Sequence, residues 1–431
     1  MSKLKRFDIS EISKKVDLHV KFVKFEMPNP FMLSSAPPTT TGEMIMRAFE
    51  AGWGGAVAKT IVPDKTYVFD YANRFGSFKL GDNIIAFQNI EEVSKRTQAE
   101  WEADVKEIKK RFPDRLLVGS LMAEADPEEW AKLARWADEA GFDMIELNFG
   151  CPHGMPERGM GAFVGQRADL TEEFTKAVVK EVSIPVMVKM TPNVTDIAYV
   201  AEAAVRGGAD AISAINTVLG IIGIDIDKME PLPSVGGLST PGGISGPAVK
   251  PIGLRCIADI AKAVKVPLSA IGGISSWRDA VEYMLVGATT LQVCTAVMLK
   301  GYRIVKEMIA GLANYLYDKG FSSPAEIVGK ALPKITTWHD IYKVGWVAPG
   351  PVVPKIDYDK CIRCGLCHVV CQDAGYQAMQ WDPEERKPEV DEEKCDACSL
   401  CMQVCPVPGC ITWTERTKPW QPKIKGEFKP H

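Results

Sequence analysis

Cysteines gather near the end of this 431-residue chain in a pattern that leaves few choices of fold. Eight of the twelve cysteines form two runs between residues 361 and 405, each with the spacing C-x2-C-x2-C-x3-C. This spacing lets one loop present three thiolates to a cube-shaped cluster, while the fourth thiolate of each run reaches a second cluster. Two [4Fe–4S] clusters are therefore predicted, one on Cys361, Cys364, Cys367 and Cys405, the other on Cys395, Cys398, Cys401 and Cys371.

Zinc and disulfide bonds are the alternative uses of so many cysteines. Zinc sites take four ligands from two pairs with a longer spacer, and a disulfide scaffold would be smaller and carry cysteines throughout. One detail departs from the bacterial ferredoxin pattern, because Cys405 is followed by Pro406 whereas Cys371 is followed by Gln372. Since thiolate spacing rather than the proline sets ligation, the pattern still favours clusters.

The rest of the chain alternates short apolar runs with stretches of helical periodicity. Eight such alternations in about 300 residues predict a (β/α)8 barrel. A doubly wound sheet is the alternative, but it favours a glycine-rich turn after its first strand, where this chain has SSAPPTTTG. Capping residues such as Asp126, Asp196 and Ser276 mark helix starts. The predicted strands are 30–36, 55–60, 116–122, 143–149, 185–190, 211–217, 267–271 and 290–296.

Four parts are expected along the chain. A barrel over 1–320 is followed by a connector over 321–354, which holds a predicted helix at 324–331 and a stretch rich in proline and glycine. A ferredoxin-like domain over 355–412 carries the two cysteine runs, and a polar tail over 413–431 ends the chain.

The charge and hydropathy of the chain exclude several function classes. A net charge of -4 and a pI near 5.9 give no positive field for nucleic acid or an anionic membrane. No apolar run is long enough to span a bilayer, and the basic N-terminal stretch lacks the continuous apolar segment of a signal peptide. A cytoplasmic protein is expected, which suits metal–thiolate sites in a reducing compartment.

Polar residues follow several predicted barrel strands at their C-terminal ends, where barrel chemistry lies. Lys59 and Thr60 end the second strand, Lys189 ends the fifth, and Asn216-Thr217 ends the sixth. Because clusters move single electrons, they need a redox partner, and the barrel holds no cysteine set for another cluster. A lysine in a barrel mouth suits the electron-rich ring of a reduced flavin, although a strand-end lysine can also simply reach solvent.

A long glycine-rich segment, NFGCPHGMPERGMG over 148–161, follows the fourth predicted strand. It has few residues able to build a core and is predicted to be a mobile active-site loop. Cys151 lies there with no other cysteine nearby, and a thiol with a pKa of about 8.5 can act as a general acid. The alternative is an inert loop residue. For His153, a loop-stabilising hydrogen bond is favoured over a proton relay.

These segments together resemble one enzyme family. The segments ELNFGCPHGMPERGMGA, KMTPNVTDI, INT, GGISGPAVKPIGLR, IGGISS and LQVCTA are similar to those of dihydropyrimidine dehydrogenases, in particular the catalytic subunit of the bacterial two-subunit form. The resemblance runs from about Asn29 to Cys410. It implies an FMN in the barrel and reduction of uracil or thymine at the 5,6 double bond, by hydride transfer to C6 and proton transfer from Cys151 to C5.

The resemblance also implies roles for individual residues. One departure is Gly150, because family members often have serine before the cysteine, and this puts fine substrate preference in question. Asparagine offers both a donor and an acceptor to an uncharged pyrimidine. Pyrimidine contacts are expected at Asn89, Glu91, Asn148, Asn216 and Thr217, and FMN contacts at Ser35, Lys59, Thr60, Lys189, Gly246, Gly272, Gly273, Cys294 and Thr295.

The sequence contains no G-x-G-x-x-G after a predicted strand and no second nucleotide-binding domain. The resemblance therefore implies a separate FAD- and NAD(P)H-binding subunit that feeds the clusters, in a heterotetramer with two copies of each chain. Two alternatives stay open. One is a dihydroorotate dehydrogenase that sends electrons out through the clusters, and the other is an electron-carrier subunit with a vestigial barrel.

Overall fold

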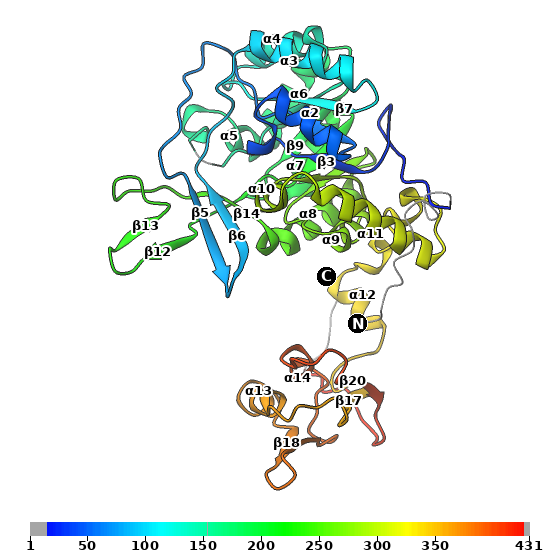
Figure 1. Ribbon diagram of the computed structural model, residues 1–431. Coiled ribbons are helices and arrows are strands. Elements are labelled where there is room, and N and C mark those ends of the chain that lie inside the picture. The colour runs from blue at the N-terminus through cyan, green and yellow to red at the C-terminus, as the bar shows by residue number, and fades with distance from the viewer. Residues whose placement is uncertain (1–14, 153, 426–431) are drawn as a thin grey trace. The chain divides into compact units, whose positions relative to one another are not determined.

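The computed structural model describes residues 15–152 and 154–425 of the chain (Figure 1). The expectation for His153, and the last six residues of the expected tail, lie outside the described residues. Two compact units are present, one ending at Pro333 and the other beginning at Lys334. Among the described residues, no helix is long and apolar enough to cross a bilayer.

The first unit is built on a closed barrel of eight parallel strands, which confirms the predicted (β/α)8 fold. Each strand falls within or overlaps one of the eight predicted segments, and several end before the predicted segment does. The residues past these early ends, such as Ser35 and Thr60, are therefore loop residues at the barrel mouth. The strands are β3 (Phe31–Leu33), β4 (Gly55–Val57), β7 (Leu116–Leu121), β8 (Met144–Asn148), β9 (Val186–Met190), β10 (Ala211–Ala214), β15 (Leu268–Ile271) and β16 (Ala288–Val293).

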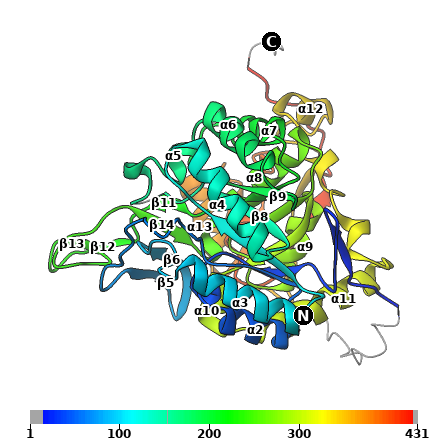
Figure 2. The same ribbon diagram turned by 90° about the horizontal axis from the view of Figure 1, so that it is seen from above.

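Helices surround the barrel (Figure 2). The predicted caps are confirmed, since the side chains of Asp126, Asp196 and Ser276 accept hydrogen bonds from the first-turn backbone of their helices. Such caps satisfy amide groups that would otherwise lack partners. The helices are α2 (Gly42–Ala51), α3 (Gln98–Arg111), α4 (Pro127–Ala140), α6 (Ala168–Val179), α7 (Ile197–Arg206), α8 (Lys250–Ala263), α9 (Trp277–Leu285) and α11 (Ile304–Lys319), with the short α5 (Ala162–Gly165) and α10 (Thr295–Lys300).

A small hairpin closes the N-terminal end of the barrel. Strands β1 (Val20–Phe22) and β2 (Phe25–Met27) pair antiparallel, and their buried residues Val20, Phe22 and Met27 pack on the first residues of the barrel strands. Because this end is filled with apolar side chains, ligands are expected at the opposite, C-terminal end.

A second sheet that the sequence analysis did not anticipate stands beside the barrel mouth. It has the strand order β11-β14-β6-β5 and unites segments far apart in the chain. Figures 1 and 2 both place it, with the outlying hairpin β12–β13, at one edge of the barrel unit. Its strands are β5 (Phe75–Leu80), β6 (Asn83–Asn89), β11 (Val218–Gly220) and β14 (Gly242–Ser245), and the hairpin is β12 (Gly223–Asp225) and β13 (Glu230–Leu232).

The predicted helix over 324–331 is wrong beyond its first turn. Only a 3-10 turn, Pro324–Ile327, forms there. Gly329 then takes a left-handed conformation with φ of 75°, and its amide donates to Met284 O of α9 rather than to a helix of its own. Ile327 is fully buried, so this part of the expected connector packs on the barrel unit.

The described residues of the second unit form two short antiparallel strand pairs and three helices. Strand β17 (Val352–Ile356) pairs with β20 (Ile411–Glu415), and β18 (Met379–Asp382) pairs with β19 (Lys387–Val390). Each cysteine run leads into a helix, α13 (Leu366–Ala374) or α14 (Leu400–Gln403), while α12 (Trp338–Lys343) precedes both. This arrangement confirms the predicted ferredoxin-like fold.

Candidate active site

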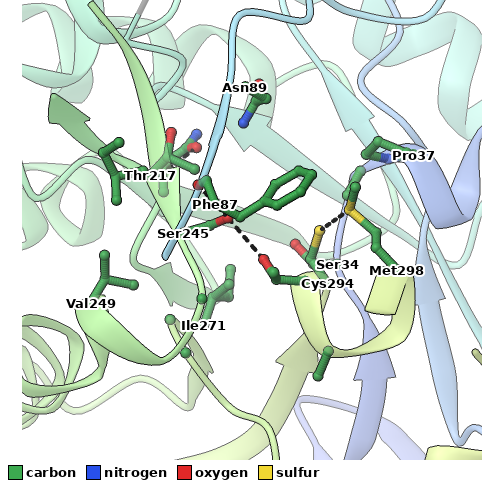
Figure 3. A pocket seen from close by; sticks show the side chains of 18 of the residues that line it. Ser34, Pro37, Phe87, Asn89, Thr217, Ser245, Val249, Ile271, Cys294 and Met298 are labelled. Atoms are coloured by element: carbon green, nitrogen blue, oxygen red, sulfur yellow. Dashed lines mark hydrogen bonds between the residues drawn. The ribbon is translucent and has the colours of Figure 1, made fainter. Parts of the chain in front are cut away.

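The barrel mouth holds a cavity of about 570 Å³, a size typical of small-molecule sites. Figure 3 shows Asn89, Phe87, Ser245 and Cys294 around it, contributed by the barrel and the added sheet. The structure brings together every barrel residue that the sequence analysis selected. The cavity is lined by Ser35, Lys59, Thr60, Asn89, Glu91, Asn148, Cys151, Lys189, Asn216, Thr217, Gly246, Gly272, Gly273, Cys294 and Thr295.

Both predicted lysines are buried and face carboxylates. The Lys59 Nζ atom lies 2.6 Å from Glu91 Oε2, and Arg74 Nε lies 3.3 Å from the other oxygen of the same carboxylate. The Lys189 Nζ atom lies 3.4 Å from Glu146 Oε1. A buried ammonium group is costly unless it is paired, so each lysine has the partner that allows it to stay inside the barrel. Glu91, expected as a pyrimidine contact, is thus already engaged by cations.

Glu146, which was not selected from the sequence, is fully buried inside the barrel. Its Oε2 atom accepts hydrogen bonds from Ser213 Oγ at 2.9 Å and Gln292 Nε2 at 3.4 Å. A single charged residue within the otherwise uncharged strand MIELN was the available signal. Gln292 also lines the cavity, and its Oε1 atom is buried without a hydrogen-bond partner among the described residues. Such an acceptor fits a ligand that brings an N–H or O–H donor.

The amides of two predicted asparagines form one chain of hydrogen bonds. Asn216 Nδ2 donates to Asn148 Oδ1, and Asn148 Nδ2 donates to Thr60 Oγ1, each at 2.8 Å. Asn193, which was not selected, donates to the carbonyl of Thr217 at 3.1 Å and fixes that residue. These contacts hold neutral donors and acceptors in place along one wall, which suits an uncharged polar ring.

Two glycine loops and the start of α10 lie together on another side of the cavity. Gly246 and Gly273 have φ of 89° and 73°, and a Cβ on Gly273 would lie 2.8 Å from Gly246 O. The loops can approach closely only without side chains, which leaves the backbone beside the cavity. Thr295 Oγ1 donates to Ser245 Oγ at 2.8 Å (Figure 3). Burial raises the pKa of the neighbouring Cys294 thiol to about 11.

The loop after β8 is better anchored than expected. Met155 and Met160 are fully buried, so the expectation that this segment contributes little to the core is wrong. The amide of Ala162 donates to Cys151 O at 3.0 Å, and a Cβ on Gly161 would lie 3.0 Å from Cys151 Cβ. The glycine therefore lets the loop fold back on Cys151, whose side chain reaches the cavity.

In the second unit, the eight cysteines of the two runs gather in two groups. Cys405, from the second run, lines a small cavity with Cys361 and the rest of its expected group. Cys371, from the first run, lies beside Cys395. Burial raises the pKa of Cys367 to about 11 and that of Cys401 to about 12, so ligation at neutral pH must release protons. Four thiols on one cavity, as in the first group, are the donor set that a [4Fe–4S] cluster needs.

Comparisons with known proteins agree with both units. The profile of the family described as dihydroorotate dehydrogenase matches residues 17–316, and that of the 4Fe-4S dicluster domain matches residues 354–413. NAD-dependent dihydropyrimidine dehydrogenase subunit PreA of Escherichia coli (strain K12) is 44% identical over 86% of this chain and 89% of its own length. The chain belongs to the dihydropyrimidine dehydrogenase family. These similarities to dehydrogenases also show that the chain is an oxidoreductase.

Two further relatives show how the family extends beyond the bacterial form. The chloroplastic dihydropyrimidine dehydrogenase (NADP(+)) of Arabidopsis thaliana is 40% identical over 76% of this chain and 80% of its own length. The catalytic subunit of dihydroorotate dehydrogenase B (NAD(+)) of Pyrococcus horikoshii is 40% identical over 73% of this chain and 98% of its own length. The barrel is thus shared between both kinds of dehydrogenase, while the dicluster domain is an additional part of this chain.

The departure from the family motif at Gly150 has a structural counterpart. A Cβ at Gly150 would lie 2.5 Å from both Cβ and Nδ2 of Asn216. We expect Gly150→Ser to displace this amide and raise the KM for a pyrimidine substrate on the order of tenfold to a hundredfold, with a smaller change in kcat. Gly223→Ser is the control, since its Cβ would meet nothing closer than 3.8 Å. Steady-state kinetics that are equal for both variants would contradict this.

Proposed function

We propose that this chain is the catalytic subunit of an NAD(H)-linked dihydropyrimidine dehydrogenase, which interconverts uracil or thymine and the 5,6-dihydro forms. The observation that carries the proposal is the composition of the cavity: a chain of neutral amides, the Cys151 thiol and two buried lysines share one space. The similarity to the E. coli and A. thaliana dihydropyrimidine dehydrogenases supports the same reaction.

FMN is the proposed cofactor of the barrel, and it supplies hydride transfer at the pyrimidine C6 when bound. Lys59 and Lys189 would stabilise negative charge on its ring, as buried cations do. The Gln292 Oε1 atom, which has no hydrogen-bond partner among the described residues, fits a ligand with a polar ring edge. The backbone of Gly246 and Gly273, which carries no side chains, fits a ligand with a phosphate. The proposed FMN contacts are Ser35, Lys59, Thr60, Lys189, Gly246, Gly272, Gly273, Cys294 and Thr295.

The remaining residues of the cavity bind the pyrimidine and move a proton. The amides of Asn89, Asn148 and Asn216, with Glu91 and Thr217, would pair with the two carbonyl and two N–H groups of the base. A site built from such groups rejects rings that leave its donors and acceptors unpaired. Cys151 would donate the proton to C5 during reduction, and its thiolate would accept that proton in the reverse direction.

The second unit would carry electrons one at a time through two [4Fe–4S] clusters. One cluster is assigned to Cys361, Cys364, Cys367 and Cys405, and the other to Cys371, Cys395, Cys398 and Cys401. We further propose that electrons come from a separate FAD- and NAD(P)H-binding subunit in a cytoplasmic heterotetramer. The E. coli relative is named as a subunit of an NAD-dependent enzyme, which supports the presence of a partner chain.

The need for a partner can be tested with the purified chain alone. We expect turnover of uracil or thymine with an artificial one-electron reductant, and NADH oxidation close to background, because the chain supplies clusters and one barrel cavity but no dinucleotide fingerprint. Stopped-flow absorbance under anaerobic conditions measures both. Rapid NADH oxidation by the chain without a partner would contradict this part of the proposal.

Dihydroorotate oxidation is the second candidate, because the P. horikoshii relative has the same 40% identity to this chain as the A. thaliana one, over a slightly shorter stretch. Orotate carries a carboxylate and requires a cation available to it. Lys59 and Lys189 are assigned to the flavin, so a carboxylate-bearing substrate would need a further cation, and the asparagine-rich wall instead favours an uncharged base. A direct comparison of uracil, thymine and orotate as substrates decides between dihydropyrimidine and dihydroorotate chemistry.

A further inference from the structure

A ninth cysteine of the second unit, Cys410, belongs to neither cysteine run and yet lines the cavity of the first group. The cavity is bordered by Cys361, Cys364, Cys367, Cys405 and also Cys410. Cys410 is 1% exposed, and the sulfurs of Cys361 and Cys405 are its neighbours. Five thiols therefore surround a space in which a [4Fe–4S] cluster needs four.

The backbone holds Cys410 in this place independently of Cys405. The Cys410 amide donates to Val407 O at 3.2 Å, and the Cys410 carbonyl accepts from the amide of Asp357 at 2.8 Å. The next residue, Ile411, begins strand β20 and pairs with Ile356 of β17. Cys405 instead follows α14 at the other end of a short turn. The two sulfurs thus enter the same cavity from opposite ends of one turn.

We propose that Cys410 is a reserve ligand of the first cluster, able to bind the iron that Cys405 binds. In the exchange, the Cys410 sulfur loses its proton and bonds to iron, while the bond between iron and the Cys405 sulfur breaks and that sulfur gains a proton. The exchange needs no oxidant or reductant, because iron keeps four ligands and one thiolate replaces another. The inference rests on the proposed assignment of two clusters.

Three variants of the full chain, purified anaerobically, test the exchange: Cys405→Ala, Cys410→Ala and the double variant. Iron and sulfide content, with low-temperature EPR of the reduced protein, counts the clusters without use of enzyme activity. We expect each single variant to keep the iron of the unmodified chain, and Cys405→Ala to show an altered EPR signal for one cluster. The double variant should lose up to half of the bound iron.

Cys371→Ala is the matched control, because Cys371 is the corresponding fourth cysteine of the other group, and Cys410, the one cysteine of this unit outside the two runs, lines the cavity of the first group. This variant should lose iron by itself. Flavin content reports whether the barrel unit of each variant has folded, and Cys405→Ser with Cys410→Ser provides a second, milder pair if the alanine variants are poorly folded.

The iron contents distinguish the proposed role of Cys410 from the proposed assignment of two clusters. If the unmodified chain holds two clusters and Cys405→Ala loses as much iron as the double variant, Cys410 is no reserve ligand, although the cluster assignment stands. If the unmodified chain holds no clusters, the proposed function of the second unit fails as well. Equal iron in Cys405→Ala and the unmodified chain, with loss only in the double variant, is the result that supports the proposal.

Discussion

Cys151→Ala should lower the rate of pyrimidine reduction by about 10²- to 10⁴-fold, the range that loss of a positioned general acid causes. Flavin and clusters should stay bound, because the Cys151 backbone holds the loop through Ala162. Substrate affinity should change little, since the amides of Asn148 and Asn216 bond to each other without Cys151.

Single-turnover measurements with the pre-reduced protein isolate this step from electron delivery. Cys151→Ser should recover only a small part of the rate, because a hydroxyl is a much weaker acid than a thiol. Cys256→Ala is the control, since that thiol is buried in α8 and does not line the cavity. If Cys151→Ala turned over at the normal rate, the proton donor would have to be another residue.

Lys189→Met should lower the free energy of unfolding by about 3–5 kcal/mol, the cost of leaving a buried charge without its partner. The carboxylate of Glu146 is fully buried and would keep its hydrogen bonds to Ser213 and Gln292 but lose its cation. The same substitution should weaken flavin binding, because one of the two buried lysines of the cavity is removed.

A double-mutant cycle separates these two effects. Adding Glu146→Gln to Lys189→Met removes the unpaired charge while keeping a side chain that can bond to Ser213. We expect this second change to restore much of the lost stability but not the affinity for flavin. Chemical denaturation of the flavin-free chain measures the first quantity, and flavin titration measures the second. An unchanged denaturation midpoint for Lys189→Met would show that the buried pair contributes nothing.

The barrel could be predicted from sequence because its signals are local. Strands such as β7 and β8 are short, mostly apolar runs that are buried along their whole length, as expected of strands covered on both faces, and caps such as Asp126 mark where helices begin. Lys59, Lys189 and Asn216 could be selected because polar side chains at C-terminal strand ends converge in any barrel of this kind. Other site residues, such as Asn89 and Gly246, were selected only through the resemblance to the family. The cysteine spacing is also a local signal, and it allowed the second unit to be predicted as a domain distinct from the barrel.

What could not be predicted depends on contacts between distant segments. Glu146 becomes meaningful only once β8 and β9 are paired in register, because this pairing brings its carboxylate to Lys189. The sheet beside the mouth joins β6 to β14, which are more than 150 residues apart in the chain, as the Asn89–Gly243 hydrogen bond illustrates. The close approach of Gly150 to Asn216 is also such a contact. The sequence alone indicates only the loss of a serine hydroxyl at Gly150, whereas in the structure a side chain at this position would collide with Asn216.

The central claim is that the barrel cavity reduces a pyrimidine base. The most direct test is anaerobic titration of the photoreduced protein with uracil, thymine and orotate in turn, while the flavin absorbance is recorded. The proposed function predicts that uracil or thymine reoxidises the flavin and that orotate does not. Reoxidation by orotate alone would assign the cavity to dihydroorotate chemistry, and no response to any of the three would contradict a catalytic role for the barrel.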